Sequence, residues 1–284
     1  MHDVAVRVGA ADWREWLLCL ADTRGLRQLE LPAALLDPDL PDALRLLDHL
    51  GLAVLHVADA IPANLSRYAS ESGLAGDEAG LAALVRFARA RLRDRVPFAS
   101  LDLGLDRLHD EGVEPGLRRR TRFLRALLSG LETSTVVLAV RVRLPRPFAG
   151  SHEWEWAGNL LHEVGAARVG LALDVVLSDV PDDFAVEALL RECAAPLAVV
   201  RLHFRWRWGE SPPAAVWERW CRALRHHPGR LGVVFCPQAP PLATAAALLA
   251  DIQGWAEALG GAYPQVRPAA AAPPGPPPPA RNRG

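Results

Sequence analysis

The sequence contains no lysine, so all 32 of its basic residues are arginines. Without a lysine amine no side-chain Schiff base can form, which excludes lysine-dependent aldolase and pyridoxal chemistry. An excess of one charge is also lacking, because 33 acidic residues leave a formal net charge of −1. Such a balance gives no electrostatic attraction to nucleic acid or to an anionic membrane, and we expect neither as a partner.

Several local signals are absent as well. The four cysteines (Cys19, Cys193, Cys221 and Cys236) are not spaced as a zinc site, so we expect reduced, buried thiols. No apolar run approaches the roughly 20 residues needed to cross a bilayer, and the first residues do not resemble a signal peptide. We therefore expect a cytoplasmic protein. The GxSxG, Walker, HExxH and GxGxxG motifs are also missing.

What the sequence does contain is an alternation of short apolar runs with amphipathic segments. Strands that alternate with helices indicate a parallel sheet, and eight of them in about 250 residues predict one closed (β/α)8 TIM barrel. In such barrels the chemistry lies at the carboxyl ends of the strands. The expected strands are VAVRV (4–8), LRQLEL (26–31), LAVLHVA (52–58), PFASLDL (97–103), TVVLAVRV (135–142), RVGLALDVV (168–176), LAVVRLHF (197–204) and LGVVFCP (231–237).

We expect the barrel to occupy residues 1–263. Residues 264–284 are rich in proline and alanine, cannot bury a core and should form a disordered tail. Between the third strand and a helix over 77–95, the Ser-, Ala- and Gly-rich stretch 62–76 is expected to be a loop. The pattern does not fix an oligomeric state.

Three strand ends, GLALDVV (170–176), VVRLHF (199–204) and LELP (29–32), resemble the xylose isomerase-like TIM barrels. That superfamily contains sugar-phosphate isomerases and epimerases and the apurinic-site endonucleases. The resemblance spans about residues 4–260 and rests on pattern and order. It implies a divalent metal held by Glu, Asp, His and Glu at the ends of strands five to eight, with Asp174 and His203 matching the middle two positions.

The outer two metal positions depart from that pattern. The fifth strand carries Arg141 or Arg143 there, and the eighth carries Cys236 or Gln238. Because a guanidinium is always protonated and repels a metal, the incomplete set favours no metal over a divalent one. Asp174 remains a candidate metal ligand together with His203, and the cofactor is otherwise unknown.

Arginines gather at the predicted barrel mouth, and guanidinium groups match the geometry of phosphate and carboxylate. A small anionic or sugar-like molecule is therefore the expected partner. The alternative is an internal ion-pair network, with Arg141 bound to Asp174 or Asp102, that fills the space of a lost metal. The candidate ligand-binding arginines are Arg141, Arg143, Arg201 and Arg205.

Tryptophans follow the fifth and seventh strands, and tryptophan rings stack well on sugar faces. We expect Trp154 and Trp206 to contact the ligand, and the alternative is that they pack loops against the barrel.

These features predict a sugar or sugar-phosphate isomerase or epimerase with Glu30, Asp102 and His203 as acid–base residues. The alternative is a non-catalytic, metal-free relative that binds a metabolite or a partner protein. Endonuclease action would need more His and Glu metal ligands than these strand ends supply.

Overall fold

The computed structural model describes residues 2–8, 12–23, 25–36, 41–72, 78–92, 96–132, 134–143, 153–165, 167–180, 185–192, 196–205, 214–238 and 242–259. Trp206 and the expected tail over 264–284 lie outside these ranges. Among the described helices, none combines the length and the apolarity that spanning a bilayer requires.

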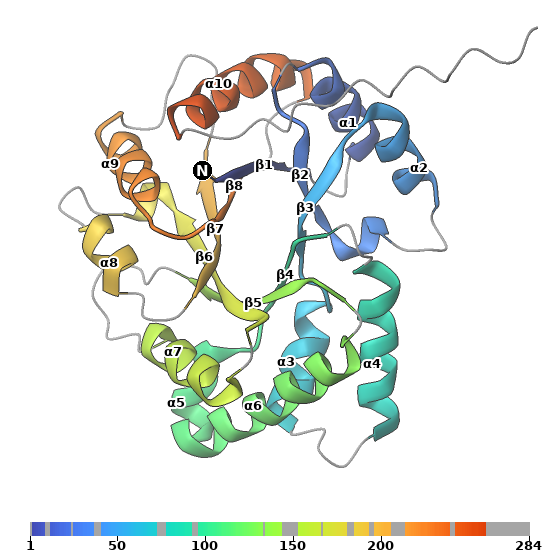
Figure 1. Ribbon diagram of the computed structural model, residues 1–284, viewed down its shortest axis with the longest axis vertical. Helices are drawn as coiled ribbons and strands as arrows, with labels where there is room; N and C mark the ends of the chain where they lie inside the picture. Colours follow the sequence, from blue (N-terminus) through green and yellow to red (C-terminus); the bar gives the residue numbers. More distant parts are fainter. Residues whose placement is uncertain are drawn as a thin grey trace, which may run out of the picture.

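The described residues contain eight parallel strands that close into a single barrel, which confirms the predicted fold (Figure 1). Each strand pairs with the next in the chain, and the last pairs with the first. The strands are β1 (Asp3–Arg7), β2 (Gln28–Pro32), β3 (Ala53–Ala58), β4 (Phe98–Leu101), β5 (Val137–Arg143), β6 (Val169–Val176), β7 (Leu197–Phe204) and β8 (Gly232–Pro237).

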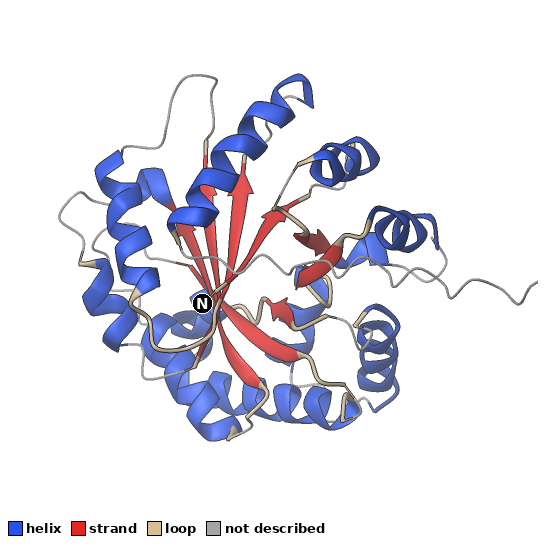
Figure 2. Ribbon diagram, turned by 45° about the horizontal axis from the view of Figure 1, so that its top comes forward, coloured by secondary structure: helices blue, strands red, loops and turns tan. Residues whose placement is uncertain are grey.

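Helices surround the strands, and the main hydrophobic core lies between the two layers (Figure 2). The α-helices are α1 (Trp13–Asp22), α2 (Pro41–Leu50), α3 (Ala63–Ser72), α4 (Glu78–Arg91), α5 (Leu108–Glu111), α6 (Val113–Gly130), α7 (Glu153–Val164), α8 (Val186–Glu192), α9 (Ala214–Arg225) and α10 (Ala245–Ala258). Because the strands are covered on both faces, they read as nearly continuous apolar runs in the sequence.

Helix α3 occupies residues for which the sequence predicted a loop, so that prediction was wrong over 63–72. Two buried serines explain the difference. Ser66 Oγ donates to the carbonyl of Asp102 at 2.6 Å, and Ser70 Oγ donates to the carbonyl of Leu103 at 3.1 Å. The serines that made this stretch resemble a loop therefore attach a helix to the segment after β4.

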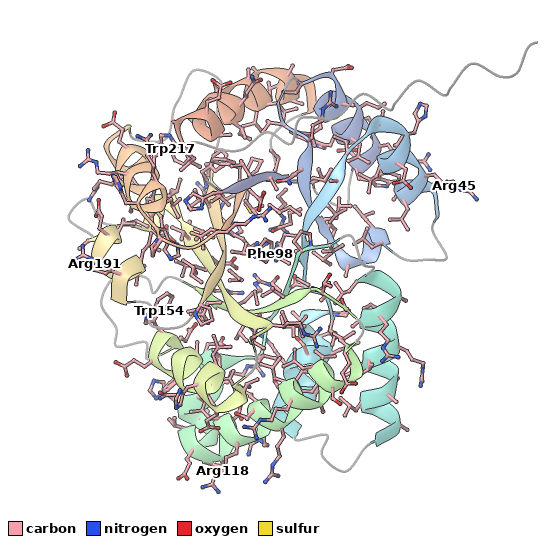
Figure 3. All side chains as sticks on the ribbon, viewed as in Figure 1. Arg45, Phe98, Arg118, Trp154, Arg191 and Trp217 are labelled. Carbon is pink, nitrogen blue, oxygen red and sulfur yellow. The ribbon has the colours of Figure 1, made fainter. Side chains whose placement is uncertain are left out.

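The inside of the barrel is filled by a second, smaller apolar cluster. Most of its members are small, which leaves room for long polar side chains beside them. The cluster consists of Ala5, Leu55, Ala139, Ala172, Ala198, Val199, Val234 and Cys236, with Phe98 and Val137 packed against it. Figure 3 shows Phe98 inside the ring of strands.

A β-bulge in β3 turns one polar side chain inward. Leu29 of β2 pairs with Val54, but the next residue, Glu30, pairs with His56, so Leu55 is an extra residue in β3. A bulge lets two consecutive side chains point to the same face of a sheet. Leu55 joins the inner cluster, and His56 also faces the barrel interior, where it contacts Glu30.

A second bulge sets the direction of β7. Leu171 pairs with Leu197 and Ala172 pairs with Val199, which makes Ala198 the extra residue. A side chain at position 170 would place its Cβ 2.7 Å from the carbonyl of Pro196 and 2.8 Å from Ala198 Cβ, so this close approach requires Gly170. Counting in steps of two from Val199, residues 201 and 203 then face the interior.

Candidate functional site at the barrel mouth

Polar side chains form a connected layer at the carboxyl-terminal side of the inner cluster. Four buried members come from four different strands: Glu30 from β2, His56 from β3, Asp174 from β6 and Arg201 from β7. Buried charges require partners, so the contacts within this layer limit what the site can do chemically.

Arg201 is the centre of the layer, with 1% of its side chain exposed. Its Nε and Nη2 donate to the two oxygens of Glu30 at 2.8 and 2.9 Å, and its Nη1 donates to Asp174 Oδ1 at 2.6 Å. Because β2 and β6 lie on opposite sides of the ring, the guanidinium connects carboxylates across the barrel. We define Glu30, Asp59, Arg141, Asp174 and Arg201 as the central ion-pair network.

Arg141 extends this network to β3. Its Nη2 and Nε donate to Asp174 Oδ2 at 2.7 and 3.2 Å, and its Nη1 donates to Asp59 Oδ1 at 2.5 Å. Asp59 follows β3 directly and has a φ of 52°, a left-handed conformation that aspartate tolerates better than most residues. These contacts agree with the internal ion-pair hypothesis for Arg141 and Asp174, while Asp102 has another partner.

Glu30 is held in its ionised form. Its Oε2 accepts a hydrogen bond from His56 Nδ1 at 2.6 Å, and both side chains are fully buried. Burial alone would raise the pKa of Glu30, but the Arg201 guanidinium and His56 outweigh it and hold that pKa well below its ordinary value. An ionised, fully bonded carboxylate is better suited to positioning Arg201 and His56 than to transferring protons.

Asp174 is ionised for a similar reason, and it lies beside His203. Burial raises the pKa of Asp174, but the contact with His203 and the charges of Arg201 and Arg141 hold it well below the ordinary range. His203 Nε2 is 3.6 Å from Asp174 Oδ1, and it has no hydrogen-bond partner among the described residues. The Nε2 atom is itself buried, although 16% of the His203 side chain is exposed.

Asp102 belongs to a separate group beside the network. It accepts hydrogen bonds from Arg67 Nη2 at 2.8 Å and from the backbone N–H of Gly104 at 3.0 Å. Burial raises the pKa of Asp102, and the bonds from Arg67 and Gly104 reverse that effect, so the net shift is downward. The predicted acid–base residue is thus already bonded to an arginine.

The remaining predicted ligand contacts lie around the rim. Arg143, at the end of β5, and Arg205, directly after β7, are both exposed. Trp154, in the first turn of α7, is half-buried and packs against the main core. That Arg143, Arg205 and Trp154 bind a ligand remains a prediction. Trp206 lies outside the described residues.

Sequence reasoning did not identify two charged residues of the mouth. Arg7 ends β1 on the same face as Ala5, and its Nε lies 3.6 Å from Glu30 Oε1. Asp59 completes the bonding of Arg141. The one sequence signal for either residue was its place at the end of an apolar run, which many surface residues share.

The fold family implies a metal, and the side chains present do not fit one. Asp174 and His203 lie together, but the β5 position carries Arg141, whose cation binds the same carboxylate. At the β8 position, burial raises the pKa of the Cys236 thiol well above its ordinary value, so the sulfur stays protonated and is a poor ligand. The described residues include no group of three or more His, Cys, Asp or Glu side chains that could hold a metal ion.

Neither a family model nor the sequence of a curated protein matches this sequence. Solved structures do share its fold. D-psicose 3-epimerase from Clostridium cellulolyticum H10, solved with D-tagatose, is 14% identical with a TM-score of 0.63, covering 90% of this chain and 99% of that one. The family 2 AP endonuclease from Brucella melitensis is 15% identical with a TM-score of 0.60, covering 88% of this chain and 99% of that one.

A third similar structure, 3-keto-D-glucoside 4-epimerase from E. coli, is 12% identical with a TM-score of 0.59, covering 89% of this chain and 99% of that one. Epimerases and an AP endonuclease are thus among the proteins whose fold this barrel shares. The chain has the fold of the xylose isomerase-like TIM barrels, as the strand-end residues indicated.

The ionised carboxylates make the protein sensitive to acid. The pKa values of the Glu30 and Asp174 carboxyls are lowered in the folded state. As the pH falls, the unfolded chain therefore protonates these carboxyls at a higher pH than the folded chain does. Their contribution is present above pH 4.5 and is lost as the pH falls below it, and one such carboxyl contributes on the order of 2.6 kcal/mol. We expect urea unfolding at pH 7, 5 and 3 to show a loss of at least this order below pH 4.5.

His2 supplies a control for this pH dependence. Burial lowers the pKa of His2, which contacts the Leu224 carbonyl at 2.6 Å, so its contribution to stability is lost as the pH falls below 6.5. The His2→Leu variant should lose the pH dependence between pH 6.5 and 5 and keep the step below 4.5. Equal stability of the wild-type protein at pH 5 and pH 3 would contradict the ionised network.

Proposed function

We propose that the protein is a metal-independent relative of the sugar isomerases and epimerases that binds a sugar-like or sugar-phosphate metabolite at an arginine-lined barrel mouth. The observation that carries the proposal is the pair of guanidiniums, Arg141 and Arg201, bonded to Asp174. Two fixed cations there supply positive charge at the place where the fold family holds a metal. They also make binding of a further cation unfavourable.

The chemistry of the mouth supports a polyhydroxylated ligand. Carboxylate, guanidinium and imidazole groups lie close together over an apolar floor, so donors and acceptors alternate over a short distance. Hydroxyl groups of a sugar both donate and accept, which suits such a surface. Names of structurally similar proteins, among them D-psicose 3-epimerase and 3-keto-D-glucoside 4-epimerase, support the same class of ligand.

Isomerase or epimerase catalysis is a second candidate, and one observation favours it. His203 Nε2 has no bonding partner among the described residues, and Asp174 Oδ1 lies 3.6 Å from it. His203 would then carry the proton transfer. The bonded carboxylates of Glu30 and Asp102 would position their neighbours, because both pKa values are lowered.

One experiment tests the proposed function. Protein purified without chelator should hold substoichiometric metal, and its Tm should be the same with and without EDTA. D-Fructose, D-tagatose or their 6-phosphates should raise the Tm by mass action. The His203→Ala variant should lose that ligand-induced shift, while the exposed His226→Ala serves as the matched control.

Two results would count against the proposal. One equivalent of tightly bound metal that is lost on His203→Ala would restore the metal-dependent mechanism. If no sugar or sugar phosphate changes the Tm, these compounds would be excluded as ligands of the mouth. Turnover of a ketohexose into its epimer by the EDTA-treated wild type, absent in His203→Ala, would select the catalytic candidate over simple binding.

A further inference from the structure

Arg7 has donor groups that the network does not use. Glu30, its nearest carboxylate, already accepts hydrogen bonds from Arg201 and His56, and Arg7 Nε stays 3.6 Å away, beyond hydrogen-bond distance. Within the described part of the chain, the Arg7 guanidinium makes no hydrogen bond, and 40% of its side chain is exposed. Arg7 therefore has unused donors on a side chain that solvent reaches.

Arg205 stands on the same side of the barrel. Its Nε donates to Gln238 Oε1 at 3.3 Å, and both residues are exposed. The backbone N–H of Gln238 donates to the carbonyl of Phe204 at 2.9 Å, which continues the pairing of β7 with β8 beyond the strand ends. This bond fixes Arg205 and Gln238 side by side at the rim.

The closed strand order brings these side chains toward one place. Strand β8 lies between β7 and β1, and Arg205 lies about two residues further along the strands than Arg7. With adjacent strands about 4.8 Å apart and a rise of about 3.3 Å per residue, the bases of the two side chains are separated by roughly 12 Å. Two extended arginine side chains can meet above the end of β8 from that distance. No acidic side chain in the described ranges lies within hydrogen-bond distance of either guanidinium.

The charged side chains of the mouth leave an excess of positive charge on the side of β8. The central network has three carboxylates (Glu30, Asp59 and Asp174) and two guanidiniums, and the Arg7 charge balances the third carboxylate. Arg205 then adds a positive charge without a counterion among the described residues. Each guanidinium nitrogen of Arg141 and Arg201 already bonds a carboxylate, whereas the arginines over β8 keep nitrogens without a carboxylate partner.

We propose that Arg7 and Arg205, with the side-chain amide of Gln238, form a phosphate-binding subsite over β8 that takes the phosphate group of a phosphorylated sugar. This inference rests on the proposed function, because the sugar part would lie over the central network. Arginine forks present paired N–H donors to phosphate oxygens, and the exposed rim avoids the cost of burying a phosphate dianion. The anion contacts therefore belong to different arginines from Arg141 and Arg201.

The test compares a neutral sugar with its phosphate. Affinities of D-fructose, D-fructose 6-phosphate and inorganic phosphate are measured by calorimetry on the wild type, on the Arg7→Gln/Arg205→Gln double variant and on Arg45→Gln. Arg45 is an exposed arginine of α2 that lies outside the barrel, so it is the matched control (Figure 3). We expect the wild type and Arg45→Gln to prefer the phosphorylated sugar at least about tenfold, with a preference that weakens as salt rises.

In the double variant the ratio of the two affinities should fall to about one, since two charged donors are lost. Equal affinities in the wild type, or an unchanged ratio in the double variant, would overturn the subsite. If D-fructose binds and the phosphate adds nothing, the proposed function survives and the subsite fails. If neither sugar binds but inorganic phosphate binds through Arg7 and Arg205, the two arginines form an anion site, and the proposed function fails together with the sugar-phosphate role of the subsite.

Discussion

Replacing Arg201 with alanine should lower the free energy of unfolding by about 3–5 kcal/mol at pH 7, the range for a broken buried ion pair. The variant leaves Glu30 without two hydrogen bonds and Asp174 without one, and both carboxylates are buried. Urea unfolding monitored by tryptophan fluorescence measures the change. At pH 3 the difference should shrink, because the released carboxylates can take up protons and lose their buried charge.

Two further variants make this result specific. The exposed Arg45→Ala should change stability by no more than about 0.5 kcal/mol, as surface substitutions do. The double variant Arg201→Ala/Glu30→Gln lacks one of the two carboxylates that lose their bonds to Arg201. The destabilisation of the double variant should therefore be smaller than the sum of the destabilisations of the two single variants. A loss below about 1 kcal/mol for Arg201→Ala would mean that the central network does not hold the barrel mouth together.

The second large effect is expected at Arg120, a fully buried arginine in the middle of α6. Its Nε donates to the carbonyl of Leu103 at 2.7 Å, and its Nη2 donates to the carbonyl of Gly104 at 2.8 Å. Both Nη groups also bind the carboxylate of Glu111, at 2.9 and 3.0 Å. Arg120→Ala should therefore cost on the order of 3 kcal/mol in thermal or urea unfolding.

Arg118 offers a matched control two residues away on the same helix. It is exposed and pairs with Glu114 one turn earlier, so Arg118→Ala should stay within about 0.5 kcal/mol of the wild type. Arg120 holds the segment that carries Asp102 and receives the serines of α3, so its loss should also loosen that side of the mouth. Equal, small effects of the two substitutions would show that the buried bonds of Arg120 are dispensable.

The barrel itself could be predicted because its evidence is local and repeated. Each strand is an apolar run, and the amphipathic segments between the runs fix the parallel order. Helix α3 could not be predicted, because its buried Ser66 and Ser70 resemble loop residues until their carbonyl partners after β4 are known. The structure thus differed from the sequence prediction where side chains bond to distant backbone.

The charged site was predictable in part. Arg141, Asp174, Arg201 and His203 were found from their places at strand ends, and the alternation of β5 put Arg141 inside. Which arginine binds which carboxylate depends on distances across the barrel that spacing along the chain does not contain. Asp59 was not predicted as a site residue, because its role requires a left-handed backbone at the end of β3. The types of the neighbouring residues do not indicate that conformation.

The two bulges are the places where β3 and β7 can differ in length by one residue without changing the mouth. Leu197 faces the helices and Val199 faces the interior, so removing the extra Ala198 would restore regular alternation and leave Arg201 and His203 facing inward. Removing a regularly paired residue such as Val200 would instead exchange the faces of the residues that follow, and Arg201 and His203 would turn toward the helices. A homologue with an odd difference in length is therefore expected to carry it at the bulge, and one that carries it elsewhere in β7 would have a different mouth.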